Sequence, residues 1–321
     1  MKIHLHMFKI AHKNLHEWYK INGRHELPWR LTNDPYKVYV SEIMLQQTQV
    51  KTVLERFYFP FLEAFPTLES LANAREDEVL KMWEGLGYYT RARNLHKSAI
   101  LCQNRLPLSA EELIALPGIG KSTAHAIASF AYKEPLAILD ANVKRILYRI
   151  FAIGKCSDKE LWEKSFLFLD KKKTYDFNQA LMDLGSTVCT GKLASCDRCP
   201  LESICQGKEK PLNYPLKKIK KAIPIRKKYI VIHFFEGKYA LKKRSSRFLN
   251  GLWGFSEYSY DEEISSTKQL GEINHTYSHF KLQAEVHTNT SFIDGYEWFS
   301  LNEIKELALS TADYKALALL D

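Results

Sequence analysis

Apolar residues recur at three- and four-residue spacing along the N-terminal part of the chain, which predicts a helical region up to about residue 206. A first helix is expected from Lys9 to Tyr19, and a long second one from about Pro35 to Phe57. Short Gly and Pro turns separate the remaining segments. We expect further helices near residues 68–83, 90–104, 110–115, 122–132, 142–150, 158–169 and 175–185.

The pattern changes after residue 229, where β-branched and aromatic residues become frequent. Tyr229–Phe235 and Tyr239–Leu241 flank a Glu-Gly-Lys turn, which is typical of a β-hairpin. Apolar and polar residues alternate at 282–286 as in a strand, and 301–309 reads as one helix. The chain therefore divides into a helical domain, a basic linker and a smaller α+β domain, at 1–206, 207–228 and 229–321.

Composition and charge narrow the classes of protein. The 321 residues are 45% hydrophobic, which is enough for a buried core and excludes disorder as a description of the whole chain. No apolar run approaches the roughly 18–20 residues of a membrane helix, and the N-terminus lacks a secretory signal. We expect a soluble, cytoplasmic protein. The net charge is +9, and the segment 207–228 holds nine Lys or Arg against one Glu, as a solvated linker or a polyanion contact would.

Four of the six cysteines crowd into a short segment with the spacing Cys-x6-Cys-x2-Cys-x5-Cys. They are Cys189, Cys196, Cys199 and Cys205. In a chain without a secretory signal, such a cluster favours a metal site over disulfides. Zinc and a [4Fe–4S] cube both take four thiolates, and the spacing does not choose between them.

The segment Leu116–Ala124 reads Leu-Pro-Gly-Ile-Gly-Lys-Ser-Thr-Ala and lies between two helical patterns. Gly118 and Gly120 allow a tight turn whose backbone N–H groups, next to a helix N-terminus, suit a phosphate. A P-loop is excluded because its first glycine would fall at Ala115 and because no strand precedes the turn. A plain connection between two helices remains the alternative.

Two carboxylates are candidates for acid–base chemistry. Asp140 follows an apolar run and is placed to cap the next helix, whose N–H groups would keep it ionised. Glu42 has apolar sequence neighbours that would raise its pKa if they enclose it. Cleavage of a glycosidic bond uses such a pair, one protonated and one ionised. Taken singly, each also fits an ordinary cap or an exposed helix acid.

The residues Ser41–Val50, reading SEIMLQQTQV, together with the cysteine spacing and the Gly-Pro turn, resemble the MutY branch of the endonuclease III and helix-hairpin-helix superfamily of DNA glycosylases. The resemblance implies a helix-hairpin-helix at about 110–130 and a [4Fe–4S] cluster on the four cysteines in a loop at 189–205. It also implies that Glu42 protonates adenine, that Asp140 stabilises the sugar cation and that Asn142 assists. Ala141 stands where the family has Gly.

The same resemblance implies the residues that contact DNA. Tyr88 matches an intercalating ring, and Ser278 and His279 match a loop that recognises 8-oxoguanine in a Nudix-like domain, with Tyr277 in place of Phe. The Glu-rich box of Nudix hydrolases is absent, so no pyrophosphatase chemistry is expected. The full set of expected DNA-contact residues is Trp29, Arg30, Gln47, Thr48, Leu86, Gly87, Tyr88, Gly118, Gly120, Ser122, Ser278 and His279.

Lyase members of the family carry a Schiff-base Lys where this chain has Ser122, and Lys121 lies one position early. The expectation is a monofunctional glycosylase that removes adenine opposite 8-oxoguanine or guanine from double-stranded DNA, as a monomer working with the bacterial nucleoid. Two alternatives remain open. One is an endonuclease III-like pyrimidine glycosylase/lyase, and the other is a non-catalytic, metal-stapled DNA-binding protein.

Overall fold

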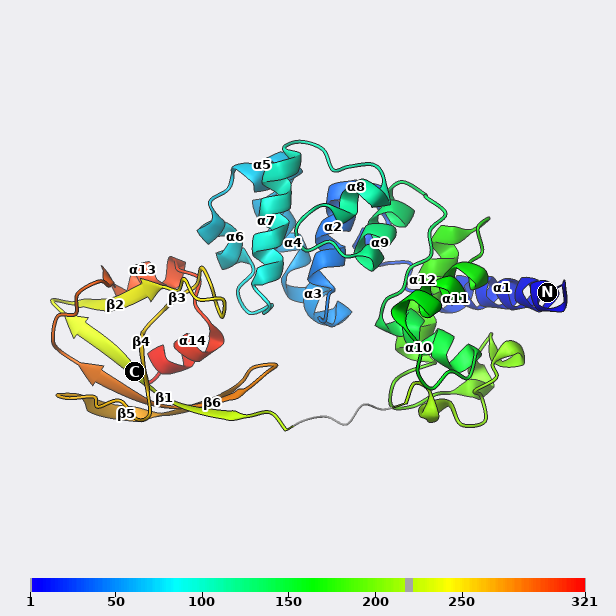
Figure 1. Ribbon diagram of the computed structural model, residues 1–321. Helices are drawn as coiled ribbons and strands as arrows, with labels where there is room; N and C mark the ends of the chain where they lie inside the picture. Colours follow the sequence, from blue (N-terminus) through cyan, green and yellow to red (C-terminus); the bar gives the residue numbers. More distant parts are fainter. Residues whose placement is uncertain (1, 217–221, 321) are drawn as a thin grey trace. The chain divides into compact units, whose positions relative to one another are not determined.

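A computed structural model describes residues 2–216 and 222–320 (Figure 1). The part of the predicted linker at 217–221 lies outside the described residues. The chain forms two compact units, 1–49 with 104–219 and 50–103 with 220–321, which are described separately. The predicted domain boundaries at 206 and 229 stay a prediction.

The first unit is helical. Its core is a cluster of apolar side chains from α1, α10, α11 and α12, and α2 packs against α9. Its elements are α1 (Lys2–Asn22), η1 (Pro28–Arg30), α2 (Pro35–Met44), α8 (Ala110–Ile114), α9 (Lys121–Ala131), α10 (Ala141–Ile150), α11 (Asp158–Phe168), α12 (Thr174–Thr187), η2 (Cys196–Arg198), η3 (Glu202–Ile204) and η4 (Pro211–Asn213).

The predicted helix-hairpin-helix is present as α8, a turn and α9. Ser109 caps α8 through a reciprocal bond with Glu112, which begins the first helix. Gly118 has φ +76°, a conformation that strongly favours glycine, and it turns the chain back. Gly120 is the N-cap of α9. The two glycines are exposed, so the backbone of the turn is open to a ligand.

The second unit begins with helices and ends with a sheet. α5 and α6 pack on α7 around the fully buried Phe61 and Trp83. The elements are α3 (Val50–Arg56), α4 (Tyr58–Ala64), α5 (Leu68–Asn73), α6 (Glu76–Met82), α7 (Thr90–Cys102), β1 (Ile225–Phe235), β2 (Lys238–Lys243), β3 (Trp253–Gly254), β4 (Ser256–Ser259), β5 (Lys268–Thr276), β6 (Lys281–Asn289), β7 (Glu297–Phe299), α13 (Leu301–Glu306) and α14 (Thr311–Leu317).

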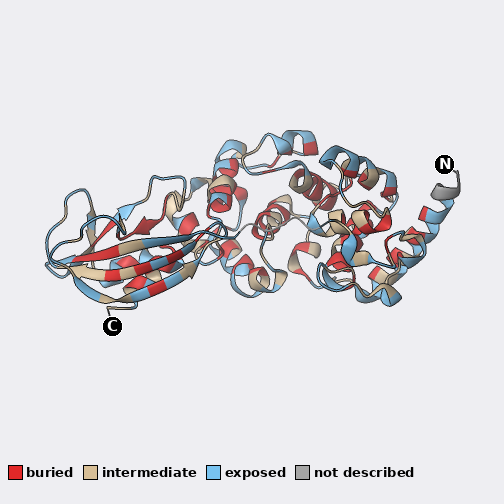
Figure 2. Ribbon diagram, turned by 60° about the horizontal axis from the view of Figure 1, so that its bottom comes forward, coloured by how far each residue is buried: buried red, intermediate tan, exposed pale blue. Residues whose placement is uncertain are grey.

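The sheet has the order β3-β2-β1-β6-β5, with β4 also pairing with β1 and β7 with β2. The predicted hairpin is β1–β2, and β1 pairs in parallel with β6. Buried and exposed positions alternate along β6, as the sequence pattern predicts for a strand with one covered face (Figure 2). α14 packs against β5.

Four helix predictions are wrong in extent. The helix expected from Lys9 to Tyr19 is longer and runs from Lys2 to Asn22. The helix expected at 35–57 ends at Met44 and resumes at Val50, because Gln47 adopts φ +58°. The helix expected at 68–83 is broken before Glu76, where Arg75 and Glu78 form a new cap. The helix expected at 301–309 ends at Glu306, and Ser310 then caps the unpredicted α14. The unpredicted α4 follows α3 directly.

Candidate active site

Glu42 lies on α2, with its side chain partly buried in the first unit. Burial, and after it the negative charge of Asp140, raise the pKa of Glu42 to about 7, and the positive charge of Arg30 opposes them. The ordinary value is 4.5, so the carboxyl keeps its proton near neutral pH much more often than an exposed glutamate does. This is the protonation state that a general acid requires.

Asp140 is the N-cap of α10, as predicted. Its Oδ1 accepts a hydrogen bond from the Val143 N–H at 2.7 Å, and its Oδ2 accepts one from Asn142 Nδ2 at 3.3 Å. We expected the cap to keep the carboxylate ionised. Burial nevertheless raises the pKa of Asp140, against the opposing effects of Val143, Arg145 and Asn142. Because these three groups stabilise the anion, Asp140 is the better candidate of the pair to remain charged, and Glu42 to hold the proton.

Asn142 is fixed in place by Arg145 and by a glycine that sequence reasoning did not identify. Arg145 Nη2 donates to Asn142 Oδ1 at 2.7 Å and to the carbonyl of Gly185 at 2.5 Å. A Cβ on Gly185 would lie 2.6 Å from Asn142 Cβ, so no larger residue fits without displacing Asn142. The close packing of α12 on α10 therefore sets the position of the amide beside Asp140.

Asp183 was also missed by the sequence analysis, although it fixes the position of Arg30. It is buried within α12, and its oxygens accept hydrogen bonds from Arg30 Nη1 at 2.7 Å and Nη2 at 2.9 Å. Arg24 Nε donates to the same carboxylate at 2.7 Å. The guanidinium of Arg30 is thus paired inside the protein and influences Glu42 through its charge. An Asp in the middle of an apolar helical stripe was the available signal.

The other predicted residues of the first unit have different surroundings. Trp29 is buried in η1 directly before Arg30. Gln47 is exposed at the break between α2 and α3, and the Thr48 hydroxyl donates to the carbonyl of Gln46 at 3.5 Å. Ser122 Oγ accepts a hydrogen bond from the Leu139 N–H at 3.3 Å, so it faces the strand-like segment before Asp140. Their contacts with DNA stay predictions.

The four clustered cysteines line one pocket at the end of the first unit, together with Arg149. Arg149 Nη1 donates to Cys189 Sγ at 3.1 Å. Burial, together with the neighbouring thiols, raises the pKa of Cys199 to about 12 and that of Cys205 to about 11. Burial and neighbouring thiols disfavour the ionised form of Cys196, Cys199 and Cys205, and a cationic metal centre would remove that penalty. Within residues 2–216 and 222–320, no three His, Cys, Asp or Glu side chains are already arranged to hold a metal ion, so the fit rests on the chemistry of the thiols and on the pocket they share.

In the second unit, Tyr88 lies at the tip of the turn between α6 and α7 and is 47% exposed. Gly85, Gly87 and Tyr88 all have positive φ, which produces a sharp turn. The Arg91 guanidinium lies over the Tyr88 ring and donates to the carbonyls of Leu86 and Gly87. The ring is therefore presented to solvent on a well-defined backbone.

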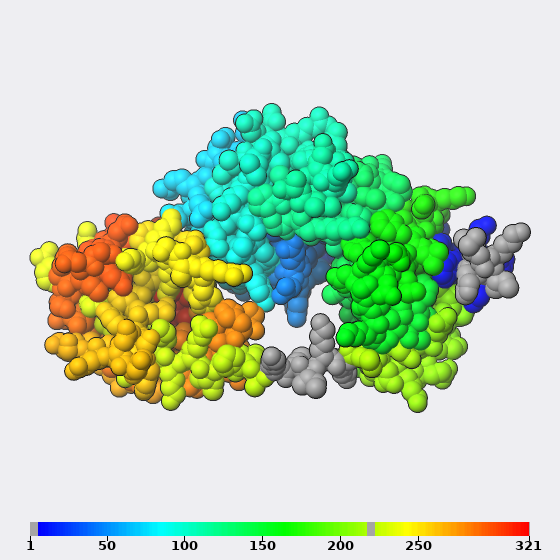
Figure 3. Space-filling view, in the orientation of Figure 1, coloured from blue at the N-terminus to red at the C-terminus, as the bar shows by residue number. Residues whose placement is uncertain are grey.

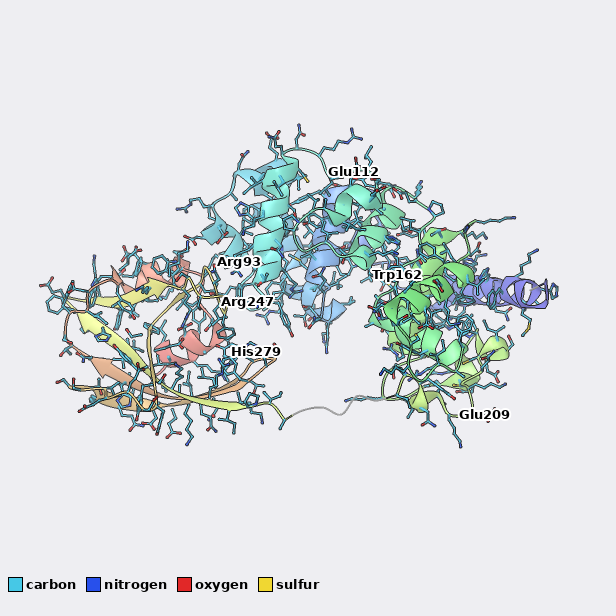
Figure 4. The ribbon with its side chains drawn as sticks, in the orientation of Figure 1. Arg93, Glu112, Trp162, Glu209, Arg247 and His279 are labelled. Carbon is cyan, nitrogen blue, oxygen red and sulfur yellow. The ribbon has the colours of Figure 1, made fainter. Side chains whose placement is uncertain are left out.

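Ser278 and His279 are both exposed in the turn after β5, where Ser278 Oγ lies 3.4 Å from His279 Nδ1. The Tyr277 ring packs on Phe248 with centroids 4.9 Å apart, and its hydroxyl is hydrogen-bonded to Ser310. The extra hydroxyl relative to Phe is therefore accommodated. Arg247 and His279 of the C-terminal part are labelled in Figure 4.

Comparisons with known proteins identify the families that this chain resembles. Residues 40–169 match the HhH-GPD superfamily of base excision DNA repair proteins, and residues 228–319 match the NUDIX domain. An adenine DNA glycosylase of Buchnera aphidicola subsp. Baizongia pistaciae is 35% identical over 94% of this chain and 94% of its own length. The human adenine DNA glycosylase is 31% identical over 93% of this chain and 72% of its own.

Solved structures share the fold of the N-terminal region. A thermostable thymine-DNA glycosylase aligns with a TM-score of 0.59 and 27% identity, over 64% of this chain and 97% of its own. An endonuclease III in a non-covalent DNA complex aligns with a TM-score of 0.55 and 20% identity, over 63% and 95%. No helix in the described part of the chain is long and apolar enough to cross a membrane. The chain belongs to the MutY-type adenine DNA glycosylase family of the helix-hairpin-helix superfamily.

Proposed function

We propose that the chain removes adenine opposite 8-oxoguanine or guanine from double-stranded DNA, as a monofunctional glycosylase of base excision repair. The observation that carries the proposal is the pairing of Glu42 and Asp140. Burial and the charge of Asp140 raise the pKa of Glu42 to about 7, while Asp140 accepts a hydrogen bond from the Val143 N–H. One carboxyl is thus suited to donate a proton and the other to face a positive charge.

In the proposed reaction Glu42 gives its proton to a ring nitrogen of the extruded adenine. The bond between the sugar and the base then breaks, and its electron pair leaves with the base. The positive charge that develops on the sugar is stabilised by Asp140, which Asn142 and Val143 orient. A water molecule adds to the sugar carbon and its proton returns to Glu42, which restores the acid.

The absence of a Schiff-base step is supported by the positions of Ser122 and Lys121. Ser122 faces Leu139 beside the reacting pair, but its hydroxyl forms no imine. Lys121 Nζ lies over the Trp162 ring of α11, 4.4 Å from its centroid (Trp162 is labelled in Figure 4). A cation–π contact of this kind holds the ammonium against the aromatic face. The chain is therefore proposed to hydrolyse the bond between the base and the sugar without cleaving the strand.

Several residues are proposed to bind and open the duplex. Gly118, Gly120 and Ser122 offer backbone donors to a phosphate at the start of α9. Trp29, Arg30, Gln47 and Thr48 line the space around the extruded base, and Leu86, Gly87 and Tyr88 form the turn that enters the stack. Insertion of a ring offsets the cost of unstacking, which is a few kcal/mol.

Recognition of 8-oxoguanine is assigned to Ser278 and His279. Their exposure and the rigid packing of Tyr277 behind them support this role. Replacing both with Ala is expected to reduce the preference for adenine opposite 8-oxoguanine over adenine opposite guanine. An unchanged ratio of the two release rates would assign the C-terminal domain another task.

We further propose that Cys189, Cys196, Cys199 and Cys205 hold a [4Fe–4S] cluster. When bound, the cluster would supply a charged centre that ties the cysteine loop to α10. The thiols surround a shared pocket, as a cube wider than one ion requires. Purified protein should contain about four iron atoms and four sulfides per chain, and Cys199→Ser should reduce both. Stoichiometric zinc in place of iron would contradict the assignment.

The experiment that tests the proposed function is a release assay on duplexes carrying adenine opposite 8-oxoguanine. Free adenine should appear, and strand breaks should appear only after alkali treatment. Breaks without alkali would favour an endonuclease III-like lyase, and binding without release would favour a non-catalytic DNA-binding protein. We also propose that the protein acts as a monomer, with the nucleoid of the cytoplasm.

A further inference from the structure

The turn that carries Tyr88 is bound on both of its flanks to one residue of the C-terminal part, Leu309. Glu84 Oε1 accepts a hydrogen bond from the Leu309 N–H at 2.9 Å. The Tyr89 hydroxyl donates to the Leu309 carbonyl at 3.4 Å and accepts from the Gly85 N–H at 3.3 Å. Leu309 and Tyr89 are buried, so these groups have little access to water.

Lys81 joins the same arrangement from α6. Its Nζ donates to Glu84 Oε2 at 3.0 Å, to the Leu307 carbonyl at 3.0 Å and to the Tyr314 hydroxyl at 3.1 Å. The segment 307–309 is held from its other side by the sheet, since the Trp253 N–H donates to the Ala308 carbonyl at 2.9 Å. The contact is thus a defined hydrogen-bonded network between the helices and the sheet domain.

A second set of contacts joins the helices of this unit to its sheet domain. Lys243 forms an ion pair with Asp77 at 2.5 Å, and Arg93 donates to the Asn250 carbonyl. A Cβ on Gly251 would lie 2.9 Å from the Leu80 side chain, so the loop approaches α6 closely. Figure 3 shows the yellow surface of residues around 245–252 against the cyan surface of the helices at 76–102. The network at Leu309 is therefore part of a continuous contact.

The turn needs such support because its own conformation is strained. Tyr88 has φ +49°, a conformation that is unfavourable for a residue with a side chain. Trp83 Nε1 and Arg91 Nη2 both bond the Gly87 carbonyl from inside the turn. Glu84 and Tyr89, which bracket the turn, are anchored from outside to Leu309. Loss of the outer anchor would leave only the inner bonds to hold the Tyr88 ring in place.

We propose that Glu84, Tyr89 and the Leu307–Leu309 segment form a clasp that positions Tyr88 for entry into the DNA stack. Glu84 and Tyr89 are positioning residues, since they act through the turn and touch no substrate. The C-terminal domain then contributes to excision opposite any base, in addition to reading the lesion. The proposal rests on the proposed function, in which Tyr88 intercalates.

The test is a double-mutant cycle on the full chain. Glu84→Gln and Tyr89→Phe should each slow single-turnover adenine release by about 2- to 30-fold, the range of coupling between packed positions. Glu63→Gln, an exposed carboxylate of α4, is the matched control and should not change the rate. In a Tyr88→Ala background, the Tyr89→Phe change should have no further effect. An equal loss in both backgrounds would overturn the clasp, as would unchanged rates in both single variants.

A second measurement keeps the clasp separate from the proposed function. A fluorotyrosine placed at position 88 of the full chain should give one sharp ¹⁹F resonance, which should broaden or shift in Glu84→Gln but not in Glu63→Gln. This readout needs neither DNA nor catalysis. If the unmodified chain releases no adenine, the proposed function is overturned. If the resonance is unchanged in Glu84→Gln, the clasp itself is overturned.

Discussion

The carboxylate of Asp140 acts electrostatically on the carboxyl of Glu42, and this repulsion adds to burial in raising the pKa of Glu42 to about 7. Asp140 is itself bonded by the Val143 N–H and by Asn142. The two carboxyls therefore differ in their surroundings, one with hydrogen-bond donors and one with a repelling neighbour. Such an asymmetry assigns the roles of acid and anion within one site.

The rate of adenine release should fall as the pH rises through about 7. The acid form of Glu42 is the active one, and its fraction decreases above the pKa of about 7. The measurement is the pH profile of kcat/KM on a duplex with adenine opposite 8-oxoguanine, taken from about pH 5.5 to 9. A profile that is flat or that rises across this range would contradict the assignment of Glu42 as the acid.

The protein should also be more stable at alkaline pH when Glu42 is replaced by Gln. The folded state keeps the Glu42 proton up to about pH 7, whereas the ordinary glutamate pKa of 4.5 applies to the unfolded chain. The native state binds more protons between these values, so stability is lost as the pH rises from 4.5 to 7. Because the side chain is only partly buried, we expect Glu42→Gln to gain about 1–3 kcal/mol at pH 8.

Urea unfolding at pH 8 and at pH 4.5 measures this difference. The two proteins should be of similar stability at the lower pH, where the carboxyl is protonated in the folded state and still half protonated in the unfolded state, so that its ionisation contributes little. A gain of equal size at both pH values would show that ionisation of Glu42 is not its cause.

Asp140→Asn should slow adenine release by about 10²-fold or more while keeping α10 intact. Asn caps a helix as well as Asp does, so the bond to Val143 is preserved and only the charge is lost. Single-turnover release and the helical circular dichroism signal are the measurements. A rate close to that of the unmodified chain would mean that the charge at Asp140 does not stabilise the transition state.

Gly185→Ala should impair release because its Cβ would meet Asn142 Cβ at 2.6 Å. We expect a destabilisation of about 1–3 kcal/mol and a slower reaction, since Asn142 would be pushed away from Asp140. Gly271→Ala is the control, because its Cβ would lie 3.4 Å from the nearest atoms of Leu319, an ordinary contact. Equal effects of the two changes on the release rate would remove the positioning role of Gly185.

Much of the fold followed from local patterns. The helices of the first unit after residue 104 lie within a few residues of their predicted ranges, because each has its own apolar stripe. α8, α10 and α11 also begin at side-chain caps. The break at Gln47 was missed, since its neighbours Gln46 and Thr48 give no stop signal and only the backbone φ of +58° reveals the turn. The cap at Asp140 was predicted because it depends on the next three residues alone.

The contacts that arrange the site are long-range and escaped prediction. Asp183 pairs with Arg30 across 153 residues of chain, and Glu84 reaches Leu309 across 225. In the sequence Gly185 is an ordinary helical glycine, and its importance depends on the contact between α12 and α10 at this point. The rise in the pKa of Asp140 was also unexpected. It results from burial, whose extent depends on the packed structure rather than on the residues next to Asp140 in sequence.

Single-turnover adenine release by Glu42→Gln, measured beside its binding to the same duplex with adenine opposite 8-oxoguanine, tests the central claim most directly. Gln keeps the size of the side chain but has no proton to donate to the base. The account predicts binding close to that of the unmodified chain and no detectable release of adenine. Release by Glu42→Gln at the unmodified rate would contradict it.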